Sequence, residues 1–357
     1  MPPSPATTRN AICLCVDRRM MIPAMFVAKS VLACAEPASN PFDIFIFAEP
    51  AEVTDEQREW MRANGVILRQ DIDLSAYRHL FDPQNRISPA TLTRLFLPSL
   101  LQDDYDRILY LDADLTIHGD PSRIFALAVG DHAFAAARSG TYFPKGETEK
   151  AQVEAHFDRI GMTKPYRYFN AGVMLIDVRR WLDRRITERA LDFLRTSFDK
   201  CRLPDEDALN SVVDGDFCAV SLIWNMVPRK TFEEYERDGP GCPVILHHMG
   251  MAKPWRPFIR YRPMRIGWYY YSLYRAFLKG TPWETWLATN WTWRDFTRNL
   301  EWELAEIVRR YTQRKQRRAH IEDRTRYFRN EPFADLAQGL VVRENGVLKV
   351  SDQGGAA

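Results

Sequence analysis

Apolar residues along this chain form short continuous runs that alternate with segments of helical periodicity. The runs at residues 11–16, 42–48 and 66–68 are almost entirely apolar, which is typical of parallel strands buried on both faces of a sheet. Between them, residues 21–35 and the segment that begins at Thr54 have helical patterns. Because strands and helices alternate, the sequence predicts an α/β fold whose mostly parallel sheet carries helices on both faces.

The same alternation continues through the middle of the chain. A helix is predicted over residues 88–100, where Pro89 suits the first turn, and a fourth strand over residues 107–111. Further strands are predicted at residues 133–137, 173–176 and 244–246, and helices at residues 186–201 and 205–213. We therefore expect one α/β domain over residues 11–255, preceded by a disordered leader over residues 1–10.

After Trp255 the composition of the chain changes. Residues 253–329 contain 18 Lys and Arg against 7 Asp and Glu, and many Trp and Tyr lie between them. Trp and Tyr favour the membrane–water interface, and basic side chains favour anionic headgroups. We expect residues 256–332 to be a helical region that attaches to an anionic membrane surface, with a helical layer packed on the α/β domain as the alternative. Residues 333–357 are expected to be a loosely folded tail.

The net charge and the cysteines indicate whether the protein binds nucleic acid and whether its compartment is reducing. The formal net charge is only +2. Aromatic and basic residues together also suit a stacking platform for nucleic acid, but we expect no nucleic-acid partner. Six cysteines are scattered without a C-x-x-C pair, which favours reduced thiols in a cytoplasmic protein. No apolar run in the sequence approaches the roughly 20 residues that span a bilayer.

Two carboxylates, Asp112 and Asp114, directly follow the predicted strand at residues 107–111. In parallel sheets ligands bind outside the carboxyl ends of the strands, and Asp17 ends the first strand in the same way. Hard divalent cations take oxygen ligands and often bridge to substrate phosphates, so the pair indicates a metal–diphosphate site. The same residues, followed by Thr116, also match the D-x-D-x-T of aspartyl phosphohydrolases, whose first aspartate is a nucleophile.

Three later segments favour the metal–diphosphate interpretation. They read YFNAGVMLI from Tyr168, LPDEDALN from Leu203 and HHMGMAKPW from His247. Together with LDAD, and in this order, they resemble glycosyltransferase family 8, the retaining nucleotide-sugar transferases of the GT-A fold, and most of all the bacterial lipopolysaccharide α-galactosyl- and α-glucosyltransferases. The resemblance covers residues 11–255 and implies a GT-A, Rossmann-like sheet.

The resemblance also implies roles for individual residues. The residues that would bind a metal ion are Asp112, Asp114 and His247. Those that would contact nucleotide and diphosphate are Asp17, Gly250 and Lys253. Those that would contact the donor sugar are Arg94, Asn170, Gly172 and Asp205. Mn²⁺ is the expected ion, with Mg²⁺ as the alternative, because a nitrogen ligand beside carboxylates suits Mn²⁺ better. The neighbouring His248 is expected to be a core histidine.

The chain departs from the family pattern at three places. Arg19 stands where the family often has asparagine, and Arg138 or Ser139 faces the space of an expected acidic sugar contact. Glu206 replaces the central glutamine of the family's D-Q-D, beside Asp205. A glutamate can attack the anomeric carbon or stabilise an oxocarbenium ion through space. We expect front-face transfer, in which the leaving phosphate accepts the acceptor's proton, Asp205 binds the sugar and Glu206 stabilises positive charge.

The expected function is Mn²⁺-dependent, retaining transfer of glucose or galactose from a UDP-sugar to a glycan acceptor. A lipopolysaccharide core sugar or another glycolipid is the expected acceptor, and the cytoplasmic face of the inner membrane is the expected location. Two alternatives remain open from the sequence. One is an aspartyl phosphohydrolase that uses Asp112 and Asp114, and the other is a non-catalytic nucleotide-sugar-binding protein.

Overall fold

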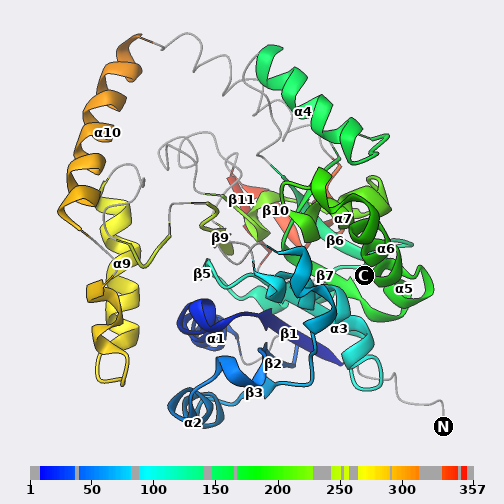
Figure 1. Ribbon diagram of the computed structural model, residues 1–357, viewed down its shortest axis with the longest axis horizontal. Helices are drawn as coiled ribbons and strands as arrows, with labels where there is room; N and C mark the ends of the chain where they lie inside the picture. The colour runs from blue at the N-terminus through cyan, green and yellow to red at the C-terminus, as the bar shows by residue number, and fades with distance from the viewer. Residues whose placement is uncertain are drawn as a thin grey trace.

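A twisted sheet of seven strands forms the centre of the computed structural model (Figure 1). Its strand order is β3-β2-β1-β4-β7-β6-β8, and only β7 runs antiparallel to its neighbours β4 and β6. The strands are β1 (Asn10–Cys15), β2 (Phe42–Phe47), β3 (Val66–Arg69), β4 (Arg107–Leu111), β6 (Phe134–Arg138), β7 (Phe169–Asp177) and β8 (Cys218–Val220). The prediction of a mostly parallel α/β sheet is confirmed.

The structure describes only part of the chain. The described residues are 9–36, 40–81, 88–139, 147–164, 167–227, 243–250, 253–256, 264–289, 292–312, 332–344 and 347–351. Most of the predicted leader, residues 1–8, lies outside them, and Asn10 already belongs to β1.

The continuous apolar runs of the sequence reflect strands that are buried on both faces. In β1, Ile12 and Leu14 pack into one hydrophobic core, whereas Ala11 and Cys13 pack into a second core on the opposite face of the sheet. Successive side chains of a strand point to opposite faces, so a strand between two cores has no polar side. The helices α1 (Met21–Cys34) and α2 (Asp55–Ala63) contribute to the first core, and α3 (Thr93–Leu101), α5 (Val178–Asp183), α6 (Ile186–Ser197) and α7 (Pro204–Val213) to the second.

Local sequence signals explain where several of these elements begin. Thr54 and Gln57 form a reciprocal capping box at the start of α2. The predicted helix over residues 88–100 is instead divided into a 3-10 turn, η4 (Pro89–Leu92), followed by α3. Another helix, α4 (Glu147–Arg159), lies beside α7, and its buried His156 is bonded to Asp207. The capping box at Thr54 and the position of Pro89 thus explain where α2 and η4 begin.

A small antiparallel ribbon lies beside the main sheet. It pairs β5 (Leu115–Ile117) with β9 (Ile245–His247), in a register that places Leu115 opposite His247. Two such short strands are marginal in isolation, but Leu115, Ile117 and Ile245 pack into the first core. The ribbon therefore brings the end of β9 beside the turn that follows β4.

The end of the chain differs from the loosely folded tail that we predicted. Described residues from 332 onward form α12 (Ala334–Ala337) and a hairpin of β10 (Val341–Glu344) and β11 (Val347–Val350). Phe333, Leu340, Val341 and Leu348 are at most 3% exposed and belong to the two cores. The prediction is wrong for these residues because short apolar segments, weak in isolation, complete the core of the α/β domain.

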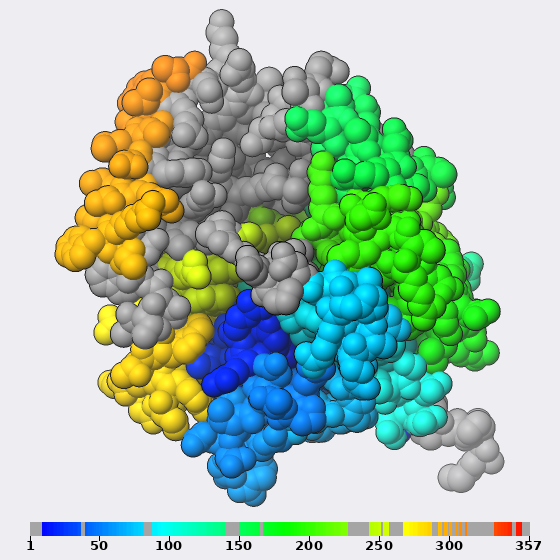
Figure 2. Space-filling model, viewed as in Figure 1, coloured from blue at the N-terminus to red at the C-terminus, as the bar shows by residue number. Residues whose placement is uncertain are grey.

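Two further helices follow the α/β domain. In α9 (Met264–Leu278), Tyr270, Tyr271, Tyr274 and Leu278 are buried, and Tyr274 stacks on Phe26 of α1 with ring centroids 3.9 Å apart. In contrast, α10 (Trp293–Thr312) stands at an outer edge of the molecule (Figures 1 and 2). Most described residues of this region lie in helices, and α9 packs on the α/β domain as a layer. Among the described residues, no helix is long and apolar enough to cross a membrane.

Candidate functional site

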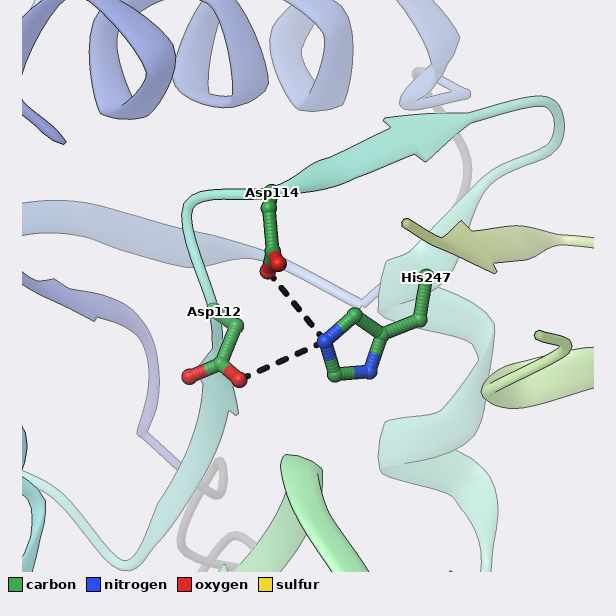
Figure 3. Close-up of side chains that lie close together, drawn as sticks. All are labelled: Asp112, Asp114 and His247. Atoms are coloured by element: carbon green, nitrogen blue, oxygen red, sulfur yellow. Dashed lines mark ion pairs between the residues drawn. The ribbon is translucent and has the colours of Figure 1, made fainter. Parts of the chain in front are cut away.

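Three predicted metal ligands lie together at one end of the sheet (Figure 3). Asp112 directly follows β4, Asp114 directly precedes β5, and His247 is the last residue of β9. The His247 Nε2 atom is 3.5 Å from Asp112 Oδ2 and 3.2 Å from Asp114 Oδ1. One potential ligand atom from each residue lies within 4.8 Å of the other two. Two carboxylate oxygens and one imidazole nitrogen at this spacing can hold one divalent cation.

Two asparagines orient the imidazole of His247. Its Nδ1 atom is 3.1 Å from Asn170 Oδ1 and 3.0 Å from Asn225 Oδ1. Both amide oxygens can accept a bond from Nδ1–H, and this fixes the ring with Nε2 directed at the two aspartates. Metal-binding histidines commonly donate their other ring nitrogen in this way. The donor set therefore fits a cation, and Asn225 belongs to a site in which the sequence did not place it.

Asp112 is oriented by Arg94 and Tyr110. Its Oδ1 atom accepts from Arg94 Nη2 at 3.0 Å and from the Tyr110 hydroxyl at 2.6 Å, so Oδ2 remains directed at His247. Arg94 also pairs through Nε with Asp205 Oδ2 at 3.0 Å and donates through Nη1 to the Ala171 carbonyl at 3.0 Å. Burial lowers the pKa of Arg94, but the two carboxylates more than offset this and raise it. Removing one partner of a buried pair typically costs about 3–5 kcal/mol.

Asp114 lies between two cationic or potentially cationic groups. Burial alone would raise the pKa of its carboxyl, but Lys253 and His247 hold that pKa well below its usual value. The Lys253 ammonium bonds Asp114 Oδ2 and, at 3.1 Å, the His248 carbonyl. Gly250, in the turn before Lys253, has a φ of +70°, a conformation that favours glycine. Lys253 therefore places a positive charge beside Asp114, the aspartate that also contacts His247.

Gly172 leaves the room in which the cluster forms. A Cβ added to this residue would overlap the imidazole of His247 and lie 2.7 Å from Asp112 Oδ2. Gly172 lies in β7 directly opposite the metal cluster, and its carbonyl accepts a bond from the Asp112 N–H at 2.8 Å. We predicted that Gly172 contacts the donor sugar, and the structure shows in addition that the backbone at this position must approach the cluster closely.

Asp205 and Glu206 begin α7 and are both buried. Glu206 Oε2 accepts from Asn170 Nδ2 and from the Ala171 N–H, each at 2.9 Å. Burial, with a smaller contribution from Asp205 and Asp207, raises the pKa of Glu206 to about 8, although the Ala171 bond opposes the shift. Burial also raises the pKa of Asp205 despite its pairing with Arg94. Asn170 thus connects Glu206 to His247, and the raised pKa favours the protonated form of the Glu206 carboxyl near pH 7.

A cavity of about 390 Å³ lies at the carboxyl ends of β1 and β2. Asp17 lines it and caps the short turn η1 (Arg18–Met20), accepting from the N–H groups of Arg19 and Met20. Arg19 Nη2 also pairs with Asp17 Oδ2 at 3.0 Å. The cavity is further lined by Arg78 and by Thr93, the residue before Arg94. Asp17 therefore lies at the end of β1, which pairs with β4, and is not part of the metal cluster.

The remaining residues singled out in the sequence lie around this site. Arg138 and Ser139 are both buried, and Arg138 lies opposite Phe169 on the neighbouring strand, one residue before Asn170. His248 is a core histidine, as expected: its Nε2 is 2.9 Å from Thr116 Oγ1 and its ring meets Tyr270 edge-on. Burial lowers the pKa of His248, so it is neutral and forms part of the packing behind the cluster.

Comparisons with known proteins agree with the geometry. A family model described as glycosyl transferase family 8 matches residues 11–258. Lipopolysaccharide 1,2-glucosyltransferase of Escherichia coli (strain K12) is 27% identical over 204 residues, which cover 55% of this chain and 56% of that enzyme. General stress protein A of Bacillus subtilis (strain 168) is 25% identical over 232 residues, covering 60% of this chain and 73% of that protein. The chain thus spans about half the length of the E. coli enzyme.

Solved structures share the fold. The galactosyltransferase LgtC, in complex with donor and acceptor sugar analogs, has a TM-score of 0.61 at 22% identity, covering 77% of this chain and 98% of that chain. The WbbM bifunctional glycosyltransferase has a TM-score of 0.60 at 20% identity, covering 81% of this chain and 52% of that chain. These similarities confirm the predicted GT-A fold.

Proposed function

The chain belongs to glycosyl transferase family 8, and we propose that it transfers glucose or galactose from a UDP-sugar to a glycan acceptor with retention of configuration. The observation that carries the proposal is the oriented cluster of half-buried Asp112 with buried Asp114 and His247 at the carboxyl end of the sheet. This is the edge at which α/β sheets bind their ligands. Lipopolysaccharide core or another glycolipid is the proposed acceptor, given the glucosyltransferase relatives.

We propose Mn²⁺ as the bound ion, held by Asp112 Oδ2, Asp114 Oδ1 and His247 Nε2, with Mg²⁺ as the alternative. When bound, a divalent cation neutralises the charge that develops on a diphosphate leaving group. Lys253 and the glycine turn at Gly250 would then add a positive charge and a close backbone approach to the same phosphates. Asp17 would contact the nucleoside in the adjacent cavity.

The donor sugar is proposed to lie between the metal cluster and the start of α7. Asp205 would bind sugar hydroxyl groups, with its carboxylate fixed by Arg94. Asn170 holds both His247 and Glu206, so its role includes setting their relative positions as well as any contact with the sugar. In front-face transfer the acceptor's proton moves to the leaving phosphate oxygen, and Glu206, when ionised, stabilises positive charge at the anomeric carbon.

A screen of UDP-sugars for donor hydrolysis with Mn²⁺ tests the proposed function. The screen needs no acceptor, because water can take the place of the acceptor hydroxyl at the anomeric carbon. The result we expect is metal-dependent release of UDP from UDP-glucose or UDP-galactose. Release of phosphate from phosphomonoesters without a UDP-sugar requirement would favour the phosphohydrolase alternative. Tight UDP binding with neither hydrolysis nor transfer would favour a binding protein.

Glu206→Gln is expected to leave the transfer rate at pH 7 within about tenfold of wild type, because a neutral carboxyl and an amide accept the same two bonds.

The same substitution should change how stability depends on pH. The ordinary glutamate pKa is 4.5, and the pKa of Glu206 is raised to about 8, so between these pH values the folded state holds a proton that the unfolded state has lost. Its contribution to stability is full below pH 4.5 and is lost as pH rises through 8. As pH rises from 4.5 to 8, wild type should therefore lose free energy of unfolding relative to the variant, by up to about 1.4 kcal/mol per pH unit.

Thermal unfolding and transfer rates of both proteins from pH 5 to 9 provide the measurement. If ionised Glu206 stabilises positive charge, the wild-type rate should rise relative to the variant above pH 8. A covalent glycosyl–Glu206 adduct detected by mass spectrometry would contradict front-face transfer, as would complete loss of activity in the variant with normal folding.

We propose that α10 attaches the protein to an anionic membrane surface near its acceptor. Trp293, Leu300, Leu304, Ile307, Val308 and Tyr311 are 43–82% exposed, and their spacing places them on one face of the helix. Arg294 and Arg298 lie on the same helix. An exposed apolar stripe beside basic residues is the pattern of helices that lie in the membrane interface.

Ile307→Glu is expected to weaken binding of the full chain to vesicles with anionic headgroups by about tenfold or more, since an apolar contact becomes a repulsive charge. Co-sedimentation at increasing salt measures the effect. The matched control is Ile67→Glu on β3, because Ile67 is also exposed, at 40% against 54% for Ile307, and lies outside α10. Equal binding by both variants would contradict attachment through α10.

A further inference from the structure

Asp335 is a buried carboxylate in the short helix α12. It is 0% exposed and accepts from the Ser221 N–H at 3.1 and 3.2 Å, from the Ser221 hydroxyl, and from Trp224 Nε1 at 3.0 Å. Burial raises the pKa of Asp335, while these bonds act in the opposite direction. A buried carboxyl is costly unless its oxygens are satisfied, so the group stabilises one conformation of the residues that it touches.

The residues that bond to Asp335 are connected to His247 by hydrogen bonds. Ser221 precedes the turn η8 (Leu222–Trp224), Trp224 ends it, and Asn225 follows. Backbone bonds join this segment to β9: Val244 N–H donates to the Ile223 carbonyl and His247 N–H to the Met226 carbonyl, each at 2.8 Å.

The side chain of Asn225 adds a second connection to the metal cluster. Its Nδ2 donates to Asn170 Oδ1 at 2.7 Å, and its Oδ1 accepts from His247 Nδ1 at 3.0 Å. The amide therefore cannot reverse without placing its own oxygen against the oxygen of Asn170. The position of residues 221–226 consequently determines both where His247 lies and which ring nitrogen faces Asp112 and Asp114.

We propose that Asp335 is a positioning residue for the metal site: it fixes residues 221–225 so that Asn225 directs His247 Nε2 at the two aspartates. Asp335 lies outside residues 11–258, the part matched by the family model, so the end of this chain completes a site carried by the family domain. The inference rests on the proposed function for the role of the cluster, but the hydrogen bonds that it concerns are made by this chain's own residues.

Asp335→Asn in the full chain tests the proposal, because one carboxylate oxygen becomes an amide donor facing the N–H and O–H groups of Ser221 and Trp224. The probe is Mn²⁺ in the presence of UDP, with free Mn²⁺ measured by electron paramagnetic resonance. We expect Mn²⁺ affinity to fall by about tenfold or more, the usual effect of losing an outer partner of a metal ligand. Affinity within twofold of wild type would overturn the proposal.

The matched control is Gln338→Ala in the same segment. Gln338 exchanges two bonds of 2.8 Å with the backbone of Ala128, away from residues 221–225, so this variant loosens the segment without touching η8. It should lower thermal stability but leave Mn²⁺ affinity unchanged; an equal loss of affinity would reduce Asp335 to a general packing role and overturn the proposal. If Asp335→Asn does not fold, Ser221→Ala removes only the hydroxyl donor, and affinity unchanged from wild type would again overturn it.

A metal-free measurement separates this inference from the proposed function. ¹H–¹⁵N spectra report the exchange protection of the Asn225 side-chain amide, whose Nδ2 donates to Asn170 Oδ1. Wild type and Gln338→Ala should show slow exchange of this amide, and Asp335→Asn should show fast exchange. If wild type binds no Mn²⁺, the proposed function fails, but the loss of protection at Asn225 still supports the positioning role. Unchanged protection of Asn225 in a folded Asp335→Asn protein overturns it.

Discussion

Asp114→Asn is expected to reduce UDP-sugar hydrolysis and transfer by on the order of 10³-fold, the several kcal/mol that a bound cation supplies to a charged leaving group. The substitution removes the negative charge on which His247 and Lys253 converge. An amide oxygen is a weaker ligand for a divalent cation than a carboxylate, so Mn²⁺ affinity should fall with activity. Steady-state rates and Mn²⁺ titrations of the purified variant measure both effects.

Asp43→Asn serves as the control for this experiment. Asp43 is an exposed carboxylate at the start of β2 that accepts from the Tyr105 hydroxyl, so the variant makes the same chemical change outside the cluster. Its activity and Mn²⁺ affinity should match those of wild type. Asp114→Asn with full activity at limiting Mn²⁺ would exclude a metal-dependent mechanism at this cluster.

Gly172→Ala is expected to weaken Mn²⁺ binding and lower activity by on the order of 100-fold or more, because misplacing a functional group by about 1 Å has effects of this size. The new methyl group cannot share the space of the His247 imidazole and would press on Asp112 Oδ2. The ring must move, and its Nε2 atom then leaves the two aspartates. The overpacking should also destabilise the fold by about 1–3 kcal/mol.

Gly119→Ala is the matched control, since Gly119 lies near the β5–β9 ribbon but its added Cβ would make only ordinary contacts of 3.7–3.8 Å with Val244. This variant should bind Mn²⁺ normally. Calorimetric titration and thermal unfolding of both variants give the comparison. Normal Mn²⁺ affinity in Gly172→Ala would show that His247 is not held where the structure places it.

Asp114→Asn and Gly172→Ala test two different contributions to the same site. Asp114 supplies chemistry, and its place in an Asp-x-Asp after a buried strand is visible in the sequence. Gly172 supplies space, and its effect depends on a strand, β7, that runs antiparallel between β4 and β6. Loss of function in both, with intact controls, would show that the cluster requires the sheet's geometry as well as its ligands.

The structure changes the predicted domain organisation at the tail and at Asn10, which already belongs to β1. The hydrophobic pattern predicted the α/β sheet because strands between two cores are apolar on both sides, as in β1. It gave no sign that Leu340, Val341 and Leu348 are buried, because they lie in short apolar segments whose burial depends on a surface formed elsewhere in the chain. Short-range periodicity carries no information about such contacts.

The sequence by itself determined the class of fold and the chemically distinctive residues: Asp112 and Asp114 at a strand end, and His247 and Lys253 in one short run. These signals are local, since strand burial, turn glycines and adjacent ligands all act within a few residues. Only the tertiary structure decided that Asn225 sets the imidazole of His247 and that Asp335 holds Ser221, 114 residues away. An asparagine or aspartate is ordinary in any sequence, and its function arises from long-range contacts that form when the chain folds.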